Sequence, residues 1–442
     1  MKDRAVEPIV VPSSPLRFRS LCVWLSVLFR SLVTAPLIVV LLPLFLTPSA
    51  DAAPWLIRPD GTGDFPTIQA ALDAAVDEDE VVLASGTFTG TGNYDLTFHG
   101  RKVVLRSETG QPADAVIDCG QHGRAFRFVN GETRDTRVEG ITITNAYEHE
   151  NSPGGGAVLC QNSSPTFRSC AFTECTCPVG GAFGISGGGP RIEHCTFYRM
   201  GNVVGTGCTG GAISVWYSTL EVADCSFRLC VSSDGGVFYS VGSTIFVDRS
   251  LLEYNVGHGS AFWGDGTTLY LRNSTVYYSS LSQIYLGGGS ALYADHSIIA
   301  SGNDVAVSCD GGSSAMLSCC DVFGHLGGDW IGCLEGQEQA GGNLGLDPLF
   351  CSGSTASRAL RPDSPCAAEN NAACGQIGAL GVGCAIPGPA GACCLSDGTC
   401  RITGADGCPG IWMGVGIGCN PNPCESTATE TTSWGRIKAG WR

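Results

Sequence analysis

A short alternation of apolar and polar residues returns about every two dozen positions through the middle of this chain. The segments are SPTFRSCAF, GPRIEHCTF, STLEVADCSF, STIFVDRSLL, TTLYLRNSTV, SALYADHSII and SSAMLSCCDV, and they align on Cys170, Cys195, Cys225, Ser250, Ser274, Ser297 and Cys320. Alternation with a period of two is typical of β-strands. The alternation slips once, just before this anchor residue, so two consecutive residues must both point outward. Each segment is therefore predicted to form two short strands joined at a corner.

A second motif keeps the same step along the chain. It consists of two small residues and an apolar one, at Gly155-Gly156-Ala157, Gly180-Gly181-Ala182, Gly210-Gly211-Ala212, Gly235-Gly236-Val237 and Gly259-Ser260-Ala261. Two motifs that share one period of this length indicate stacked structural units. With strands spaced about 4.8 Å apart, stacking places equivalent side chains in continuous internal columns. We therefore expect an all-β protein, a parallel β-helix of about ten coils over residues 53–386.

The ends of the chain differ from this repeat. Residues 1–52 carry basic residues ahead of LVTAPLIVVLLPLFL and predict a signal peptide cleaved after Ala52, with a membrane anchor as the alternative. The segment FPTIQAALDAAVDEDE predicts an amphipathic capping helix with Thr67 as its N-cap. Beyond a linker at 387–390, a Cys-rich module is expected at 391–424 and a disordered tail at 425–442. The basic, aromatic end SWGRIKAGWR is either a sorting tag or a frayed tail.

Composition narrows the class of protein. The 62 glycines and the charged fraction of only 15% suit a turn-rich β protein, and the net charge of −16 argues against nucleic acid as a partner. The sequence contains no phosphate-binding or nucleotide fingerprint. We expect the chain to associate with a membrane only through its leader or its C-terminal tail. The predicted location is extracellular or on the outer surface.

The 24 cysteines fit an exported chain, in which disulfides can form. The C-terminal module is too short for a sufficient core, so disulfides are expected among Cys393, Cys394, Cys400, Cys408, Cys419 and Cys424. Cys170, Cys195 and Cys225 share one column and admit two interpretations. Either two of them form a disulfide between coils, or all three are small apolar filler whose place Ser takes further along.

Several segments resemble known families. DGTGDFPTIQAALDAA (60–75) resembles the N-terminal segment of the pectin-lyase-like superfamily, and the Gly-Gly-Ala motif with LEYN (252–255) is similar to the GGA and FxxN repeats of polymorphic outer-membrane proteins. From about 54 to 384 the chain resembles secreted bacterial right-handed parallel β-helix repeat proteins. The resemblance implies a right-handed coil. It leaves the activity open, because that superfamily includes lyases, hydrolases, esterases, adhesins and inert stalks.

The predicted corners bring charged residues together. Asp224 and Asp248 fall on neighbouring coils with Arg249 and Arg272 beside them, which is the set a polysaccharide lyase would need for calcium and for proton removal. The alternative is that outward corners are polar and their charges pair across coils. Cysteine and histidine spacings typical of a zinc site are missing. No metal or other cofactor is therefore predicted, calcium being the one ion left open.

Outward aromatic residues are the other candidates for binding. Phe246, Tyr270 and Tyr293 are predicted to share one exposed face, with Tyr239 and Trp263 on another. Flat apolar rings suit pyranose sugars, although aromatic columns also stabilise β-helices by stacking on themselves. The preferred function is an exported, non-catalytic protein that presents a rigid face to polysaccharide or a cell-surface glycan. The alternative is a polysaccharide lyase or related enzyme that acts on acidic glycans.

Overall fold

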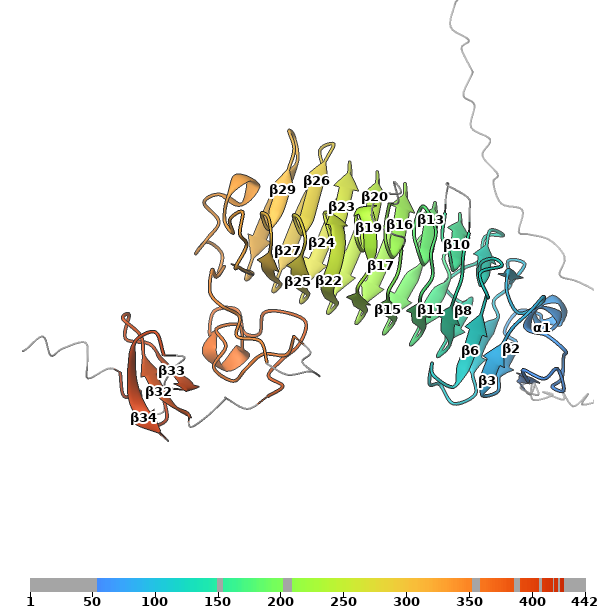
Figure 1. Ribbon diagram of the computed structural model, residues 1–442, viewed down its shortest axis with the longest axis horizontal. Coiled ribbons are helices and arrows are strands. Elements are labelled where there is room, and N and C mark those ends of the chain that lie inside the picture. The colour runs from blue at the N-terminus through green and yellow to red at the C-terminus, as the bar shows by residue number, and fades with distance from the viewer. Residues whose placement is uncertain are drawn as a thin grey trace, which may run out of the picture. The chain divides into compact units, whose positions relative to one another are not determined.

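The computed structural model describes residues 54–148, 154–201, 209–351, 358–384, 390–404, 408–415, 417–419 and 422–424 (Figure 1). The predicted leader, most of the linker and the predicted tail lie outside these residues. The described part is an all-β parallel solenoid of about ten coils, followed by a small disulfide-rich region. Each full coil contributes one strand to each of three parallel sheets.

The strands of the first sheet are, in spatial order, β1 (Trp55–Ile57), β2 (Glu80–Leu83), β5 (Val104–Ser107), β8 (Arg137–Glu139), β11 (Thr166–Arg168), β14 (Arg191–Glu193), β17 (Thr219–Ala223), β21 (Thr244–Asp248), β24 (Thr268–Arg272), β27 (Ala291–Asp295) and β30 (Ser314–Ser318). The second sheet consists of β4 (Leu96–Thr97), β7 (Phe126–Phe128), β10 (Val158–Gln161), β13 (Phe183–Ser186), β16 (Ile213–Trp216), β20 (Phe238–Val241), β23 (Phe262–Asp265), β26 (Ile284–Gly287) and β29 (Val307–Cys309). The third sheet consists of β3 (Gly86–Phe88), β6 (Ala115–Asp118), β9 (Thr142–Thr144), β12 (Ala171–Thr173), β15 (Thr196–Tyr198), β18 (Ser226–Arg228), β22 (Leu251–His258), β25 (Thr275–Ser279), β28 (Ile298–Gly302) and β31 (Asp321–Phe323), and β19 (Val231–Asp234) also pairs with β22.

Equivalent residues of successive coils lie side by side, as the repeat predicts. On the first sheet Leu220, Ile245 and Leu269 are in register and fully buried. On the third sheet Phe197 stacks between the rings of Phe172 and Phe227, with centroid distances of 4.9 and 4.5 Å. The inward positions therefore form one continuous apolar core.

The corner between the first and third sheets explains the slip in the alternation. The residue before each anchor has a positive φ, such as 54° at Asp224 and 45° at Arg249, which turns the chain in a single residue. From Cys195 to Ser297, each anchor side chain accepts a hydrogen bond from the backbone N–H of the previous anchor. The distances are 3.4 Å from Cys195 N to Cys225 Sγ and 3.1 Å from Cys225 N to Ser250 Oγ.

This column corrects the disulfide interpretation. Cys170, Cys195 and Cys225 are all free and buried. Each sulfur lies close to backbone groups, since Cys195 Sγ accepts from Cys170 N at 3.4 Å and donates to the Glu193 carbonyl at 3.2 Å. The thiols therefore bond to backbone groups as the serines in the following coils do. They are not merely small apolar side chains that fill space.

The paired glycines are required by two different close contacts. Gly180 has a φ of +70°, and a Cβ there would lie 2.1 Å from the Phe183 carbonyl oxygen. At Gly181 a Cβ would lie 2.2 Å from the carbonyl oxygen of Gly211 on the next coil. The motif thus marks a point where the backbone closely approaches both its own coil and the next coil, so that a side chain would not fit.

Both ends of the solenoid are capped. Helix α1 (Ile68–Ala74) buries Ile68, Ala71 and Leu72, and Thr67 accepts the N–H of Ala70 at 3.2 Å, as an N-cap should. At the other end two amide side chains form hydrogen bonds with backbone groups of β30, the last strand of the first sheet. Gln337 Oε1 accepts from Leu317 N at 2.9 Å, and Asn343 Nδ2 donates to the Leu317 carbonyl at 3.0 Å. The η1 turn (Gly332–Leu334) lies beside this strand.

Residues 344–351 and 358–384, with the η2 turn (Ala368–Asn370), fold back onto the third sheet. Arg358 Nε pairs with Glu253 Oε2 at 3.1 Å, and the ring of Phe350 meets that of Tyr277 edge-on. Three disulfides that were not predicted hold the C-terminal end of the solenoid, namely Cys309–Cys333, Cys319–Cys374 and Cys351–Cys384. On the first sheet the outward side chains of Arg272 and Tyr293 are exposed, and those of Phe246 and Tyr270 are half-buried.

The Cys-rich module is a separate three-stranded antiparallel sheet. Its strands are β32 (Ala390–Cys394), β33 (Cys400–Gly404) and β34 (Ile411–Val415), with β32 in the centre. The predicted cysteines pair as Cys393–Cys408, Cys394–Cys424 and Cys400–Cys419. In the described part of the chain, no helix combines the length and apolar character needed to cross a membrane.

Candidate functional site

The outward face of the first sheet carries two parallel columns of side chains. One column runs through Arg191, Glu221, Phe246, Tyr270, Tyr293 and Met316. The other runs through Glu193, Ala223, Asp248, Arg272, Asp295 and Ser318. The corner residues Asp224 and Arg249 border the second column. This face therefore holds both the acid–base candidates and the first group of predicted ligand-binding aromatics.

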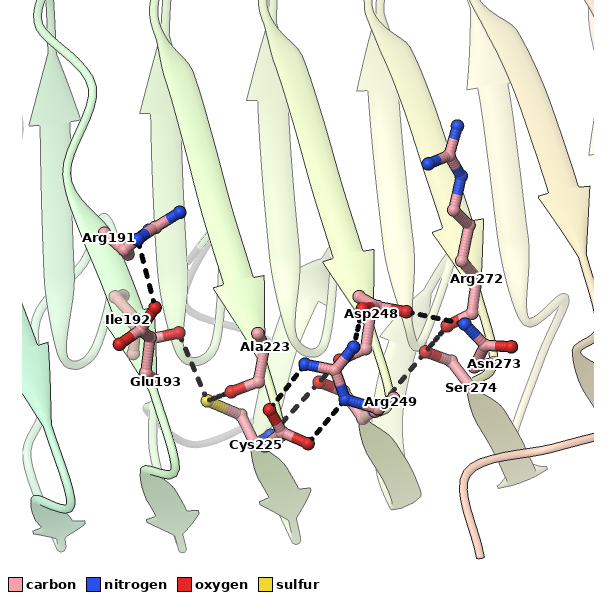
Figure 2. A network of polar contacts seen from close by, with 12 residues as sticks. Arg191, Ile192, Glu193, Ala223, Cys225, Asp248, Arg249, Arg272, Asn273 and Ser274 are labelled. Atoms are coloured by element: carbon pink, nitrogen blue, oxygen red, sulfur yellow. Dashed lines mark hydrogen bonds and ion pairs between the residues drawn. The ribbon is translucent and has the colours of Figure 1, made fainter.

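Three of the four acid–base candidates form one network (Figure 2). Arg249 donates from Nε and Nη2 to the two carboxylate oxygens of Asp224, at 2.8 and 2.7 Å. Its remaining terminal nitrogen pairs with Asp248, which also accepts from Asn273 Nδ2 at 2.9 Å. The hydrogen bonds from Arg249 hold the pKa of Asp224 below its usual range, and those contacts raise the pKa of Arg249.

This pairing limits the chemistry of the network. Arg249 stays protonated, so it donates hydrogen bonds and does not accept a proton. The carboxylates of Asp224 and Asp248 are already paired with the guanidinium of Arg249, so in this arrangement they do not fit a calcium ion. Among the residues that the structure describes, no group of three or more His, Cys, Asp or Glu side chains is arranged to hold a metal.

Arg272 lies apart from the network. Figure 2 shows its side chain extending away from Asp248 and Arg249. The guanidinium carbon lies 5.8 Å from the ring centroid of Tyr270, and no described carboxylate pairs with it. The register of the coils could be predicted from the sequence, but the direction of this one side chain could not.

The predicted aromatic face is a stack. The rings of Phe246 and Tyr270 lie 4.8 Å apart with an interplanar angle of 6°, and those of Tyr270 and Tyr293 lie 5.3 Å apart at 16°. Tyr270 is therefore sandwiched, with both of its faces covered. The outer face of Phe246 is turned toward Glu221, and that of Tyr293 toward Met316, which are the next residues of the same column.

A shallow hollow lies at each end of this stack. The first has a volume of about 360 Å³ and is lined by Arg191, Glu193, Glu221, Val222, Ala223, Phe246, Asp248 and Arg249. The second has a volume of about 550 Å³ and is lined by Tyr270, Arg272, Asn273, Tyr293, Ala294, Asp295, Met316, Leu317 and Ser318. Sites for small ligands usually fall in this size range and combine apolar walls with a few polar groups.

The other predicted pair lies on the second sheet, away from these hollows. Tyr239 and Trp263 stack at 4.5 Å and 6°, and Tyr285 continues the stack at 5.7 Å from Trp263. Trp216 leans against Tyr239 at 5.5 Å. Sequence reasoning missed Tyr285 and Trp216, although the spacing of Tyr285 from Trp263 is close to the repeat period.

Comparison with known proteins supports the fold. The family model described as a right handed beta helix region matches residues 127–276, so the coils form a right-handed parallel β-helix. A 145-residue stretch, 31% of this chain, is 29% identical to metabotropic glutamate receptor-like protein R of Dictyostelium discoideum, and spans 9% of that relative's length. The predicted bacterial origin and the specific likeness to GGA and FxxN repeats stay predictions.

Similar solved structures include pectate lyase Pel9A, at 14% identity and a TM-score of 0.40, covering 67% of this chain and 82% of that one. A pectin methylesterase from carrot has 11% identity and a TM-score of 0.30, covering 68% and 91%. A mannuronic acid specific polysaccharide family 6 lyase from human gut microbiota has 14% identity and a TM-score of 0.30, covering 61% and 80%.

Proposed function

We propose that this protein is an exported, non-catalytic β-helix that binds polysaccharide or a cell-surface glycan on the outer face of its first sheet. The observation that carries the proposal is the stack of Phe246, Tyr270 and Tyr293 with a hollow at each end. A sugar ring has apolar faces and a polar edge, so it suits a flat ring bordered by charged and amide side chains.

The scaffold supports a binding role because it is rigid. The columns of the first sheet are held by strand pairing on both sides, and the corner side chains are held by ion pairs. A preorganised face loses little conformational entropy when a ligand binds. The six disulfides among the described residues support export, since such bonds persist in oxidising compartments.

Glycan binding by the purified chain tests the proposal, with Phe246→Ala, Tyr293→Ala and the second-sheet variant Trp263→Ala compared. Removing a partly covered aromatic contact should cost about 1.4 kcal/mol, so at least one first-sheet variant should lose about tenfold in affinity for a given glycan. The Trp263→Ala variant should bind like the unmodified protein. Loss of binding in Trp263→Ala alone would move the site to the second sheet and overturn this assignment.

The lyase alternative is tested separately, by the absorbance of unsaturated uronate products with and without calcium. No product is expected, because the carboxylates of Asp224 and Asp248 are already paired with Arg249. Product formation that Asp248→Asn abolishes would show that the protein is an enzyme.

A further inference from the structure

We propose that the first-sheet face carries two separate sugar sites of different charge, one for a neutral sugar beside Phe246 and one for an anionic sugar beside Arg272. The inference rests on the proposed glycan-binding function and deepens it. It follows from three features of the face: the covered rings in the middle of the stack, the complete pairing of charges around the first hollow, and the unpaired guanidinium in the second.

The stack divides the face into two sites. Tyr270 is covered on both sides, so a sugar cannot lie flat along the whole row of rings. Phe246 borders only the first hollow and Tyr293 only the second. Their strands β21 and β27 are two coils apart, about 10 Å at the usual strand spacing. The two hollows therefore lie at opposite ends of the stack along the solenoid.

The lining of the first hollow includes one small side chain, Ala223. Ala223 stands in a column where the neighbouring coils carry Glu193 and Asp248, so the floor beside Phe246 is open. This opening lies diagonally beside Phe246, whose own neighbour in the column is Glu221. It gives a pyranose ring room to contact the side of the Phe246 ring and the polar rim together.

The charges around the first hollow are satisfied by the protein. Arg191 Nε pairs with Glu221 Oε2 at 3.0 Å, and Arg168 Nη2 pairs with Glu193 Oε2 at 2.9 Å. Arg249 bridges the two aspartates, as described above. An anionic ligand would have to break one of these pairs, whereas the hydroxyl groups of a neutral sugar can bond to the rim without doing so.

The second hollow offers the opposite chemistry. Arg272 is exposed, and its guanidinium has no carboxylate partner among the described residues. Asp295, its neighbour in register, lies 3.0 Å from Nδ1 of His296 and forms no ion pair with Arg272. A guanidinium binds a carboxylate or a sulfate through two parallel hydrogen bonds. A uronate or a sulfated sugar bound in this hollow against the exposed side chains of Tyr293 and Met316 would bring such a group beside Arg272.

Titration calorimetry with short defined probes tests this arrangement on the exported chain. The probes are a neutral cello-oligosaccharide, an oligogalacturonate and a sulfated galactan oligosaccharide. The neutral probe should bind once, should lose at least tenfold in affinity in Phe246→Ala, and should be unaffected by Arg272→Gln. An acidic probe should show the reverse pattern, and the tighter of the two acidic probes identifies the anion.

Further measurements separate the inference from a structural effect. Arg106→Gln removes an arginine of the same sheet that pairs with Glu80 far from both hollows, so it should leave both bindings unchanged. Arg272→Lys should keep part of the acidic binding, which should weaken as salt rises. Saturation with one probe should leave the other able to bind.

Three outcomes would overturn the inference. Competition between the neutral and acidic probes, with Phe246→Ala and Tyr293→Ala each abolishing both, would show one continuous site and leave the proposed glycan-binding function standing. Acidic binding that is indifferent to Arg272→Gln would refute the role of that residue. Absence of binding by every probe and by polysaccharide would remove the proposed function together with the inference.

Discussion

Replacement of Ser250 by alanine tests the hydrogen-bonded column at the corner. Ser250 is fully buried, and its Oγ accepts from Cys225 N at 3.1 Å and donates to the Asp248 carbonyl at 2.9 Å. The alanine variant leaves the Cys225 amide buried without an acceptor. A buried donor that loses its partner costs about 1–3 kcal/mol, so the free energy of unfolding should fall by about 2 kcal/mol.

Ser250→Cys is the matched control. Cysteine already fills this column at Cys195 and Cys225, where Sγ accepts an N–H at 3.4 Å. The thiol keeps a weak acceptor in place, so this variant should lose less than half of what the alanine variant loses. Methionine or leucine at this position would test volume and not hydrogen bonding.

Urea unfolding followed by circular dichroism gives the free energies, and equal slopes for all variants make them comparable. Hydrogen exchange of peptides that contain Cys225 should accelerate in the alanine variant and much less in the cysteine variant. A decrease in the free energy of unfolding of less than about 0.5 kcal/mol for Ser250→Ala, or equal decreases for both variants, would refute the role of the hydrogen bond. The anchor would then be only a small side chain that fills space.

Three further predictions concern stability. Burial raises the pKa of Asp321 to about 7, so between about pH 4 and pH 7 the folded chain holds a proton that the unfolded chain releases. The free energy of unfolding should therefore fall as the pH rises through this range, by up to about 1.4 kcal/mol per pH unit. In Asp321→Asn, melting temperatures should depend less on pH over the same range. Gly180→Ala should destabilise by more than 1 kcal/mol and lower the urea midpoint, because its Cβ meets a carbonyl oxygen at 2.1 Å; an unchanged midpoint would contradict this contact. Loss of the Cys319–Cys374 disulfide, which spans 55 residues, should cost up to about 4 kcal/mol in Cys319→Ser by the chain-entropy estimate, measured by thermal melting under non-reducing conditions.

Much of the solenoid could be predicted because its inward positions repeat with the coils. A residue such as Leu269 meets nearly the same neighbours as Ile245, so periodicity alone assigns both to the core. The slip in the alternation likewise located the corner. The role of the anchor was harder to predict, because Cys and Ser are both small. Their shared ability to bond to a backbone amide was the signal available, since alanine never replaces them there.

The non-repeating parts could not be predicted in the same way. Arg358 pairs with Glu253 across 105 residues, and no period relates the two. The adjacency of Asp224 and Arg249 followed from coil register, whereas the orientation of Arg272 depends on its own rotamer and on the ring of Tyr270. The hollow beside Phe246 is lined in part by the small side chain of Ala223, which stands out only once its column is known.

The amide side chains over the last strand of the first sheet have a consequence for how the protein behaves at high concentration. An open parallel edge is a template on which a second chain can add, and repetition of that event produces fibrils. Gln337 and Asn343 occupy donors and acceptors of β30 that an incoming strand would need. The solenoid thus ends its own growth, and a chain stripped of these two amides should nucleate end-to-end polymers.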